Sequence, residues 1–316
     1  MKLVSICLVT YNSSQFVIDA LESIKEQTYP NIELIVSDDC SEDNTMKIVK
    51  AWIEKNATRF FNVCLNTNNK NLGITKNLNL SFNLARGVYL KPLGGDDILM
   101  KDCIKKMVDF LEKEELEFGY SKVIPFTSDH DLVYERKLQD QEIIKYRIFD
   151  LDIENQYREL LKDYCINTGG FFLKKSFFNR VGLFDETYQM MEDYPFVLKA
   201  IKNGYRLNLC NEYLFMYRVR TINEQKEFFQ TQRNIKHIND LEKLQKNIII
   251  PEMKKRKMYL DLYNLKIKTI EKKIITSSNN KYKKMFGKMF GYLSLHKLKN
   301  KLTILSKKSL NIHKSI

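Results

Sequence analysis

The first hundred residues alternate between short apolar runs and amphipathic segments, and no other feature of the sequence limits the fold as strongly. The apolar runs are rich in β-branched residues, which is typical of buried strands, and they cover residues 3–9, 32–37, 60–65 and 88–93. Apolar residues at helical spacing mark the segments between and after them, at 14–27, 48–53, 74–85 and 104–111. Strands that alternate with helices in this way form a parallel sheet covered by helices. The sequence therefore predicts an α/β fold.

The alternation becomes less regular after about residue 118. Strands are expected at 119–126, 169–174 and 214–219, and a helix at 192–204, where Gly204 suits a C-cap. From residue 223 onwards the sequence is helical in character, and no Gly/Ser linker precedes it. We therefore expect an α/β domain at 1–222 and a helical region at 223–316.

The positive charge is concentrated in the last fifth of the chain. The formal net charge is +13, but residues 251–316 hold 18 Lys and Arg against 3 Asp and Glu, whereas residues 1–250 hold 34 against 36. The N-terminal domain is thus close to neutral, and nucleic acid is not an expected partner.

Membrane spans and a secretion signal are not expected either. No apolar run approaches the roughly 20 residues that cross a bilayer, and no small-residue cleavage site follows residues 3–9, so we interpret that run as a strand. The six cysteines are scattered without a C-x-x-C pair, which argues against a zinc site or a disulfide framework and favours a reducing cytoplasm.

Polar clusters follow three of the predicted strands directly. They are Thr10, Tyr11 and Asn12 after the first strand, Asp38 and Asp39 after the second, and Asp96 and Asp97 after the fourth. In an open α/β sheet, ligands bind outside the carboxyl ends of the strands, so these side chains are expected at one edge. A further pair, Glu192 and Asp193, opens the helix at 192–204.

The chemistry of these clusters excludes several common sites. The sequence has no G-x-G-x-x-G or P-loop motif and no nucleophile elbow, and its four histidines lie outside the clusters. An aromatic ring can stack on a base, and carboxylates can accept from ribose hydroxyls or hold a divalent ion on a diphosphate. Each pair could instead cap a helix, so only their joint placement points to a nucleotide site.

Four stretches of the sequence resemble family 2 glycosyltransferases, the inverting, nucleotide-sugar-dependent enzymes of the GT-A fold. They are "VSICLVTYNSSQFVIDALESIKEQTYPNIELIVSDDCSEDNT", "NLGITKNLNLSFNLARGVYLKPLGGDDIL", "VGLFDETYQMMEDYPFVLKAIKNGYRL" and "YLFMYRVR". The resemblance covers roughly residues 1–220. It implies a Rossmann-like mixed sheet flanked by helices, with a helical C-terminal extension. It also implies sugar transfer from a nucleotide-sugar, UDP by family frequency, to a glycan or lipid-linked acceptor in surface polysaccharide synthesis.

The resemblance also implies roles for individual residues. Thr10, Tyr11 and Asn12 hold the nucleotide, with Tyr11 against the base, and Lys76 and Asn77 line the donor pocket. Asp39 accepts from the base or ribose, and Asp38 supports it. Asp96 contacts the ribose or the diphosphate, and Asp97 coordinates Mn²⁺ or Mg²⁺. Asp193 is the general base, with Glu192 beside it.

Two departures from the family pattern keep alternatives open. Gly94 stands where the metal motif often has an aspartate, and Arg220 stands where a histidine often follows. Gly94 motivates one alternative hypothesis, a degenerate transferase that acts as a membrane-associated assembly partner. A second alternative is a sugar nucleotidyltransferase, which could use a similar sheet and metal carboxylates. The latter normally carries an early basic phosphate-binding loop, and "TYNSSQ" is not one.

Residues 281–308 have the pattern of a basic amphipathic helix. Phe286, Phe290 and Leu293 share one face, and lysines fill many other positions. Such a helix suits an anionic membrane surface, which would place the enzyme at the inner face of the cell membrane. The alternative is a helix packed on its own domain or on a second subunit of a homo-oligomer.

Overall fold

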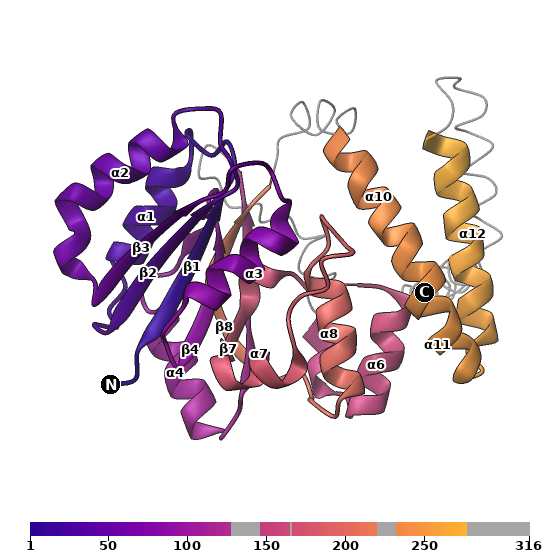
Figure 1. Cartoon of the computed structure of the whole chain (residues 1–316). Coiled ribbons are helices and arrows are strands. Elements are labelled where there is room, and N and C mark those ends of the chain that lie inside the picture. Colours follow the sequence, from indigo (N-terminus) through magenta and orange to yellow (C-terminus); the bar gives the residue numbers. More distant parts are fainter. Residues whose placement is uncertain (128–145, 165, 220–231, 277–316) are drawn as a thin grey trace, which may run out of the picture. The chain divides into compact units, whose positions relative to one another are not determined.

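The computed structural model describes residues 1–127, 146–164, 166–219 and 232–276, and in these it has one sheet of eight strands (Figure 1). The strands are β1 (Val4–Thr10), β2 (Ile32–Asp38), β3 (Asn62–Thr67), β4 (Tyr89–Gly94), β5 (Ile98–Leu99), β6 (Phe118–Phe126), β7 (Phe171–Lys174) and β8 (Leu209–Arg218). Their spatial order is β3-β2-β1-β4-β7-β6-β8-β5. β3, β2, β1 and β4 are parallel, whereas β7 is antiparallel to β4 and β6. The sheet is mixed, which confirms the predicted fold class.

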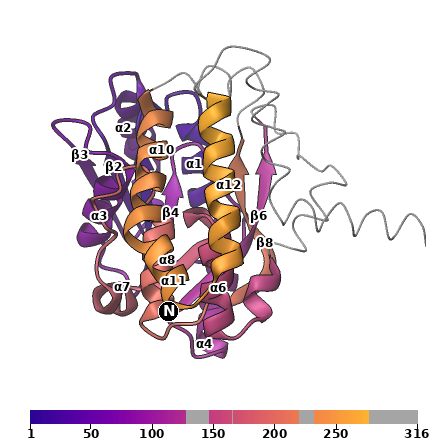
Figure 2. The same cartoon turned by 90° about the vertical axis from the view of Figure 1, so that its right-hand side faces the viewer.

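The register of the parallel strands places their polar carboxyl ends together. β1 pairs with β2 so that Thr10 lies beside Asp38, and β1 pairs with β4 so that Val9 lies beside Gly94. β6 and β8 run side by side and parallel to each other (Figure 2). Because β7 is antiparallel to both β4 and β6, β8 points the same way as β4 and ends at Arg218 on the same edge of the sheet.

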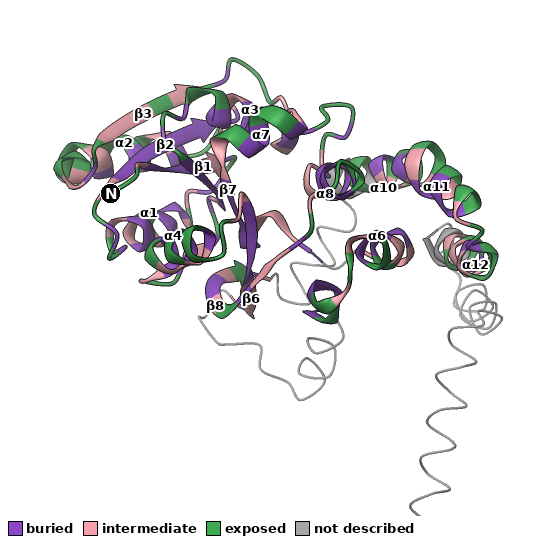
Figure 3. Ribbon diagram, turned by 90° about the horizontal axis from the view of Figure 1, so that it is seen from below, coloured by how far each residue is buried: buried purple, intermediate pink, exposed green. Residues whose placement is uncertain are grey.

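Helices cover both faces of this sheet. α1 (Val17–Lys25) and α4 (Cys103–Lys113) lie on one side, and α3 (Ile74–Leu84) and α7 (Lys175–Val181) lie on the other (Figure 3). The remaining α-helices are α2 (Thr45–Asn56), α6 (Ile153–Lys162), α8 (Asp193–Lys202), α10 (Gln232–Leu244), α11 (Ile250–Lys255) and α12 (Tyr259–Thr276). α4 buries the apolar residues that its sequence spacing predicts. α6, α7 and β5 were not predicted.

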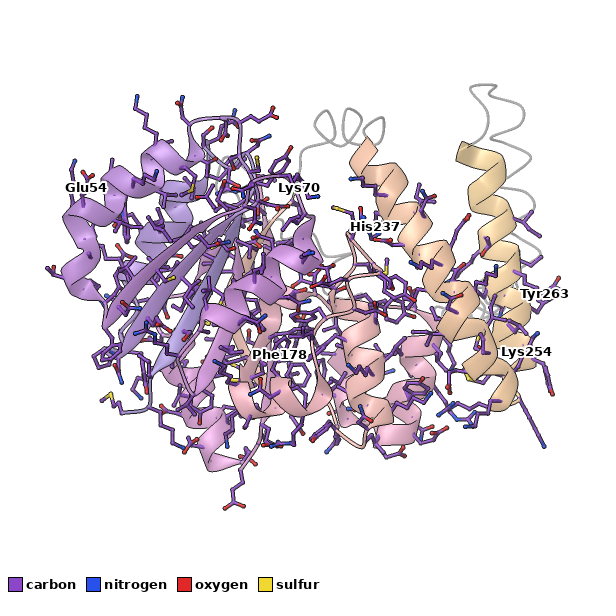
Figure 4. The ribbon with its side chains drawn as sticks, in the orientation of Figure 1. Glu54, Lys70, Phe178, His237, Lys254 and Tyr263 are labelled. Carbon is purple, nitrogen blue, oxygen red and sulfur yellow. The ribbon has the colours of Figure 1, made fainter. Side chains whose placement is uncertain are left out.

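An aromatic cluster joins three helices on one side of the molecule. Phe82 of α3 contacts Phe178 of α7 with ring centroids 4.9 Å apart (Figure 4), and Phe196 of α8 lies 4.6 Å from Phe184. Burial of each ring contributes roughly 1.5–3 kcal/mol. The cluster therefore fixes α8, whose first residue is Asp193, relative to α3.

The chain divides into two compact units, Met1–Lys243 and Leu244–Ile316. α10 falls in the first unit except for its last residue, and α11 and α12 fall in the second. The predicted boundary at 222/223 and the predicted basic helix at 281–308 lie outside the described residues and stay predictions. In the part of the chain that the structure describes, no helix combines the length and apolarity needed to cross a membrane.

Candidate active site

Asp38 organises the loop that follows β2. Its buried carboxylate accepts hydrogen bonds from Thr10 Oγ1 at 2.8 Å, Ser41 Oγ at 2.6 Å and Ser41 N at 2.8 Å. A carboxylate with three short donors is well satisfied without a ligand. Thr10 and Asp38 therefore order the edge of the sheet and the start of the loop after β2.

The loop after β1 leaves one aromatic ring open to solvent. Asn12 has a φ of 49°. Its backbone N–H donates to Ser41 Oγ at 2.9 Å, and its side-chain oxygen accepts from Glu42 N at 2.9 Å. Asn tolerates this left-handed conformation better than most residues. Tyr11 is 43% exposed at the same edge, so its ring is accessible for stacking.

Asp39 holds the segment before α3. Its carboxylate accepts from Leu72 N and Gly73 N at 2.8 Å each and from Asn68 Nδ2 at 2.9 Å. Gly73 has a φ of 89°, where a side chain would be strained. Asp39 is thus the anchor of a loop, a contact that the sequence did not predict, and little of its acceptor capacity is left for a ligand.

The two predicted residues on α3 have different surroundings. Asn77 is buried and accepts from Ser37 Oγ at 2.6 Å and Asn68 Nδ2 at 3.1 Å while donating to Ser37 O at 2.8 Å. It therefore fastens α3 to β2 from within. Lys76 lies at the surface, 3.9 Å from Glu186, where an exposed pair contributes little.

Gly94, Asp96 and Asp97 form a tight turn after β4. A Cβ atom on Gly94 would lie 2.9 Å from Asp97 Oδ2 and 3.1 Å from Asp96 Oδ1. A Cβ atom on Gly95 would lie 2.8 Å from Ser13 Oγ. The two glycines therefore let the acid pair pack closely against the loop after β1, and a larger residue at 94 would crowd both carboxylates.

Arg218 at the end of β8 braces this turn. Its backbone N–H donates to Asp97 Oδ1 at 3.0 Å, Nε donates to the Asp96 carbonyl at 2.8 Å, and Nη2 donates to Asp19 Oδ2 at 3.0 Å. Its guanidinium also lies over two rings, those of Phe16 and Phe126, at 4.4 and 4.5 Å. The sequence reading drew attention to Arg220, which lies outside the described residues, and missed Arg218.

The acid pair has the electrostatics of a cation site. Asp97 is 7% exposed, and burial, reinforced by the Asp96 charge, raises the pKa of its carboxyl group. Carboxylate oxygens are the ligands that Mg²⁺ and Mn²⁺ prefer. Among the described residues no group of three His, Cys, Asp or Glu side chains is placed to hold a metal ion. The pair thus fits a divalent ion that takes its other ligands from a bound substrate and water.

Glu192 and Asp193 lie at the start of α8. Asp193 Oδ1 accepts from Tyr194 N at 2.7 Å, and Thr168 Oγ1 donates to Glu192 Oε1. Burial, followed by the Glu192 charge, raises the pKa of Asp193. A carboxyl group with a raised pKa is better suited to accept a proton near neutral pH than an ordinary aspartate.

The segment before α8 is attached to α3. Thr75 Oγ1 donates to the Tyr188 carbonyl, Asn79 Nδ2 donates to the Phe184 carbonyl at 3.0 Å, and a Cβ atom on Gly73 would lie 3.1 Å from Gln189 O. The loop that Asp39 anchors therefore touches the loop that leads to Asp193. These contacts connect Asp39 at the end of β2 with Glu192 and Asp193 at the start of α8.

The family model described as Glycosyl transferase family 2 matches residues 5–182. The chain belongs to this family. Glycosyltransferase GlyG of Streptococcus pneumoniae is 25% identical over 233 residues, which cover 70% of this chain and 72% of GlyG. The UDP-Glc:alpha-D-GlcNAc-diphosphoundecaprenol beta-1,3-glucosyltransferase WfaP of Escherichia coli is 33% identical over 121 residues, which cover 38% of this chain and 46% of WfaP.

Solved structures show the same fold. S. aureus TarS 1-349 in complex with UDP-GlcNAc superimposes with a TM-score of 0.54 at 17% identity, covering 87% of this chain and 81% of that one. Mannosyltransferase PcManGT from Pyrobaculum calidifontis, in complex with GDP-Man and Mn²⁺, gives 0.53 at 18% identity over 77% and 64% of the two chains. The longer TarS chain is matched over 49% of its length. This family 2 glycosyltransferase therefore has the GT-A fold.

Lys91 is a buried residue of this glycosyltransferase that the sequence reading missed. It lies in the middle of β4, donates to the carbonyls of Gly169 and Phe171, and lies 4.8 Å from the centre of the Phe215 ring. Burial lowers its pKa to about 8. The signal in the sequence is a single charge inside an otherwise apolar strand. Lys91 ties β4, the strand that leads to Asp97, to the turn whose Thr168 contacts Glu192.

α10 supports the acceptor side of the family 2 domain. Asp240 Oδ2 accepts from Met190 N at 2.7 Å, and Lys243 Nζ donates to the Thr187 carbonyl at 2.9 Å. His237 Nδ1 lies 3.4 Å from the Met190 carbonyl (Figure 4). These contacts hold the 187–190 segment just before Asp193. Sequence reasoning missed them, because a polar helix gives no local sign of the loop that it contacts.

Proposed function

We propose that this chain is an inverting glycosyltransferase that moves a sugar from a nucleotide-sugar donor, with UDP as the nucleotide, to a hydroxyl group of a glycan or lipid-linked acceptor in bacterial surface polysaccharide synthesis. The observation that carries the proposal is the acid pair at the strand edge, the exposed Asp96 beside the buried Asp97, where Tyr11 is open for stacking. The names of WfaP and of the TarS complex support a UDP-linked donor.

Donor binding would use the strand edge. Tyr11 stacks on the base, and the loops ordered by Asp38 and Asp39 surround the ribose. Asp97, with Asp96 beside it, would hold Mn²⁺ or Mg²⁺, and the PcManGT complex supports a metal ion in this fold. When bound, such an ion neutralises charge on the diphosphate and stabilises the departing nucleotide. Arg218 keeps the acid pair in place through its contacts to both residues.

Transfer would use Asp193 as the general base. Its carboxylate takes the proton of the acceptor hydroxyl, and the hydroxyl oxygen attacks the anomeric carbon from the face opposite the diphosphate. The bond from the anomeric carbon to the diphosphate oxygen breaks, and its electron pair leaves with the nucleotide. One displacement inverts the configuration. Glu192 lies beside the base, and its bond from Thr168 orients it.

The proposal is tested by nucleotide binding to the full chain. We expect a thermal shift with UDP that exceeds the shift with GDP, dTDP or CMP and that depends on Mn²⁺. A ligand at about 100 times its dissociation constant adds roughly 2.7 kcal/mol to the free energy of unfolding. Asp97→Ala should lose the metal-dependent part, whereas Asp109→Ala, an exposed matched control on α4, should keep it.

Absence of any shift would reject donor binding and favour the degenerate assembly partner, the alternative that Gly94 suggests. If only GDP shifts the melting temperature, the proposed glycosyltransferase activity stands, and the donor nucleotide is GDP instead of UDP.

We also propose contact with an anionic membrane surface through residues 281–308, as the charge pattern of the sequence suggests. This contact would bring the active site to a lipid-linked acceptor at the inner face of the membrane. A homo-oligomer formed through the same residues is the competing proposal.

A further inference from the structure

Two buried polar atoms near Asp193 have no hydrogen-bond partner among the described residues. They are Tyr164 Oη and Asn167 Oδ1. Buried polar atoms are nearly always paired, because an unpaired one loses its bonds to water without replacement. Two such atoms within four residues of each other therefore point to a polar ligand.

The Tyr164 ring is held rigidly beside the proposed base. It stacks on the ring of Tyr194, with centroids 4.2 Å apart and planes 16° apart, and Tyr194 Oη donates to the Leu160 carbonyl of α6. The Tyr164 hydroxyl lies against the Asp193 carboxyl, where burial followed by the Asp193 charge raises the pKa of Tyr164. Its interaction with the Asp193 carboxyl group also contributes to the raised pKa of Tyr164, but the hydroxyl stays outside the distance and angle of a full hydrogen bond. The hydroxyl is thus close to the base and without a full hydrogen bond.

Asn167 lies in a tightly packed turn. Its backbone N–H lies 3.3 Å from Tyr120 Oη. A Cβ atom on Gly169 would clash with the Phe215 ring, and one on Gly170 would clash with the Tyr120 ring. The turn is therefore packed between two rings.

The next residue of this turn, Thr168, donates to Glu192, so Asn167 lies one residue from a contact with the Glu192–Asp193 pair. The turn thus carries an amide oxygen without a partner among the described residues close to the carboxyl group that Tyr164 approaches.

We propose that Tyr164 Oη and Asn167 Oδ1 recognise the acceptor, as the two groups that hydrogen-bond hydroxyls of a polyhydroxylated acceptor while Asp193 takes the proton of the attacking one. This inference rests on the proposed function. The acceptor hydroxyl loses its proton to Asp193 and its oxygen bonds to the anomeric carbon, as described above. Tyr164 pairs with the attacking hydroxyl, and Asn167 Oδ1 accepts from a neighbouring hydroxyl of the same acceptor.

The test uses the full chain, Mn²⁺, the nucleotide-sugar chosen by the thermal shifts, and two hydroxyl probes, water and glycerol. Mass spectrometry measures the share of sugar transferred to glycerol, present at about 1 M, rather than to water. We expect Tyr164→Phe and Asn167→Ala each to lower that share at least about tenfold, because a site built to bind hydroxyl groups discriminates through them. The nucleotide thermal shift should not change.

Thermal stability separates recognition from a structural role. Removing an unpaired buried hydroxyl should leave or raise the melting temperature of the free enzyme, so Tyr164→Phe should lose glycerol transfer without losing stability. Ser121→Ala is the matched control, because Ser121 Oγ is also buried without a partner among the described residues, on β6. It should match the parent in glycerol transfer.

Three results would overturn the inference: an unchanged glycerol share in both variants, a lowered melting temperature in Tyr164→Phe, or a parent that transfers to neither probe. A site that binds hydroxyls through these two atoms would accept so small a triol. Failure of the proposed function has a different signature, since no nucleotide would then shift the melting temperature. An intact nucleotide shift with unchanged variants rejects only the acceptor site.

Discussion

Lys91 carries a positive charge into the interior of the sheet, and its surroundings explain how it is tolerated. The ammonium group has two carbonyl acceptors and an aromatic face, which replace part of its hydration. Burial still disfavours the charged form, so its pKa is lowered to about 8 from the ordinary 10.5.

Stability should therefore depend on pH through Lys91. Between about pH 8 and 10.5 the unfolded chain holds this proton and the folded chain releases it, so the free energy of unfolding rises with pH, by up to about 3 kcal/mol. Buried cysteines with raised pKa values act in the opposite direction, so the comparison must be with Lys91→Met. In urea unfolding at several pH values, the free energy of unfolding of the parent should rise with pH relative to that of Lys91→Met. A difference that does not change with pH would contradict the lowered pKa of Lys91.

Asp193→Asn should separate stability from activity. Because the folded-state pKa of Asp193 is raised, this carboxyl group favours the fold below its ordinary pKa and loses that contribution as pH rises through the raised value. At neutral pH the Asn variant should be at least as stable as the parent, and this advantage should vanish in acid. The variant should lose sugar transfer and keep the shift of its melting temperature with the nucleotide. Equal transfer by variant and parent would remove Asp193 from the base role.

The sequence predicted where the polar residues stand but not what they bind. Asp38, Asp39 and Asp97 follow strands whose apolar runs are clear, so their place at the edge could be read directly. The partners of Asp39 come from residues 68–73, some thirty positions later, and no local pattern encodes such contacts. The partners of Asn77 could not be predicted from the local sequence either, because they lie on β2 and in the loop before α3.

The helices and strands after residue 118 were harder to predict than those in the first hundred residues. β8 was expected at 214–219 and runs from Leu209 to Arg218, so the arginine that reaches Asp97 is two positions earlier than the one considered. The strand pairs with β6 through two register shifts, between Ser121 and Lys122 and between Lys122 and Val123, which a period-two pattern does not reveal. α7 has only seven residues, too few for a clear helical period. α6 buries Gln156, Tyr157, Leu160 and Leu161 at helical spacing, so its signal was present in the sequence and was missed.

α10 should control the order of the segment before Asp193. Asp240→Asn replaces the charged acceptor of the Met190 N–H by a weaker one, so this amide should exchange with solvent about tenfold faster, and the free energy of unfolding should fall by about 1 kcal/mol. Hydrogen exchange with mass spectrometry on the 184–194 peptide measures it. Glu242→Gln on the same helix serves as the control, and unaltered exchange in Asp240→Asn would mean that α10 does not hold this segment.

For the molecule as a whole, the mixed sheet was within reach of the sequence because its first four strands are local. β1 to β4 follow one another through helical crossovers of common length, so their parallel order is dictated by the alternation. The second half of the sheet interleaves β7 between β4 and β6 and returns β5 to the far edge. That order depends on packing between distant segments and was not predicted; the resemblance to the family implied only that the sheet is mixed.

The charge asymmetry of the whole chain leads to a binding prediction. Full-length protein should co-sediment with vesicles rich in phosphatidylserine and not with neutral ones, and the binding should weaken with salt, because each lysine near the lipid contributes about 1 kcal/mol of screened attraction. Replacing Phe286, Phe290 and Leu293 by serine should abolish it at constant charge. If the substituted chain sediments like the parent, residues 281–308 are not the anchor, and sizing by light scattering then tests the oligomer.

The contacts of Asp240 and Lys243 set a joining point for hybrid enzymes. Exchanging the C-terminal region from residue 223 onwards would give the segment before Asp193 a foreign helix, with no guarantee of an acid opposite the Met190 amide. An exchange that begins after Lys243 leaves the first compact unit whole. Under the proposed membrane contact of residues 281–308, hybrids joined there should keep the donor and acceptor specificity of one parent and take the membrane attachment of the other. Related enzymes could then differ in where they act while making the same product.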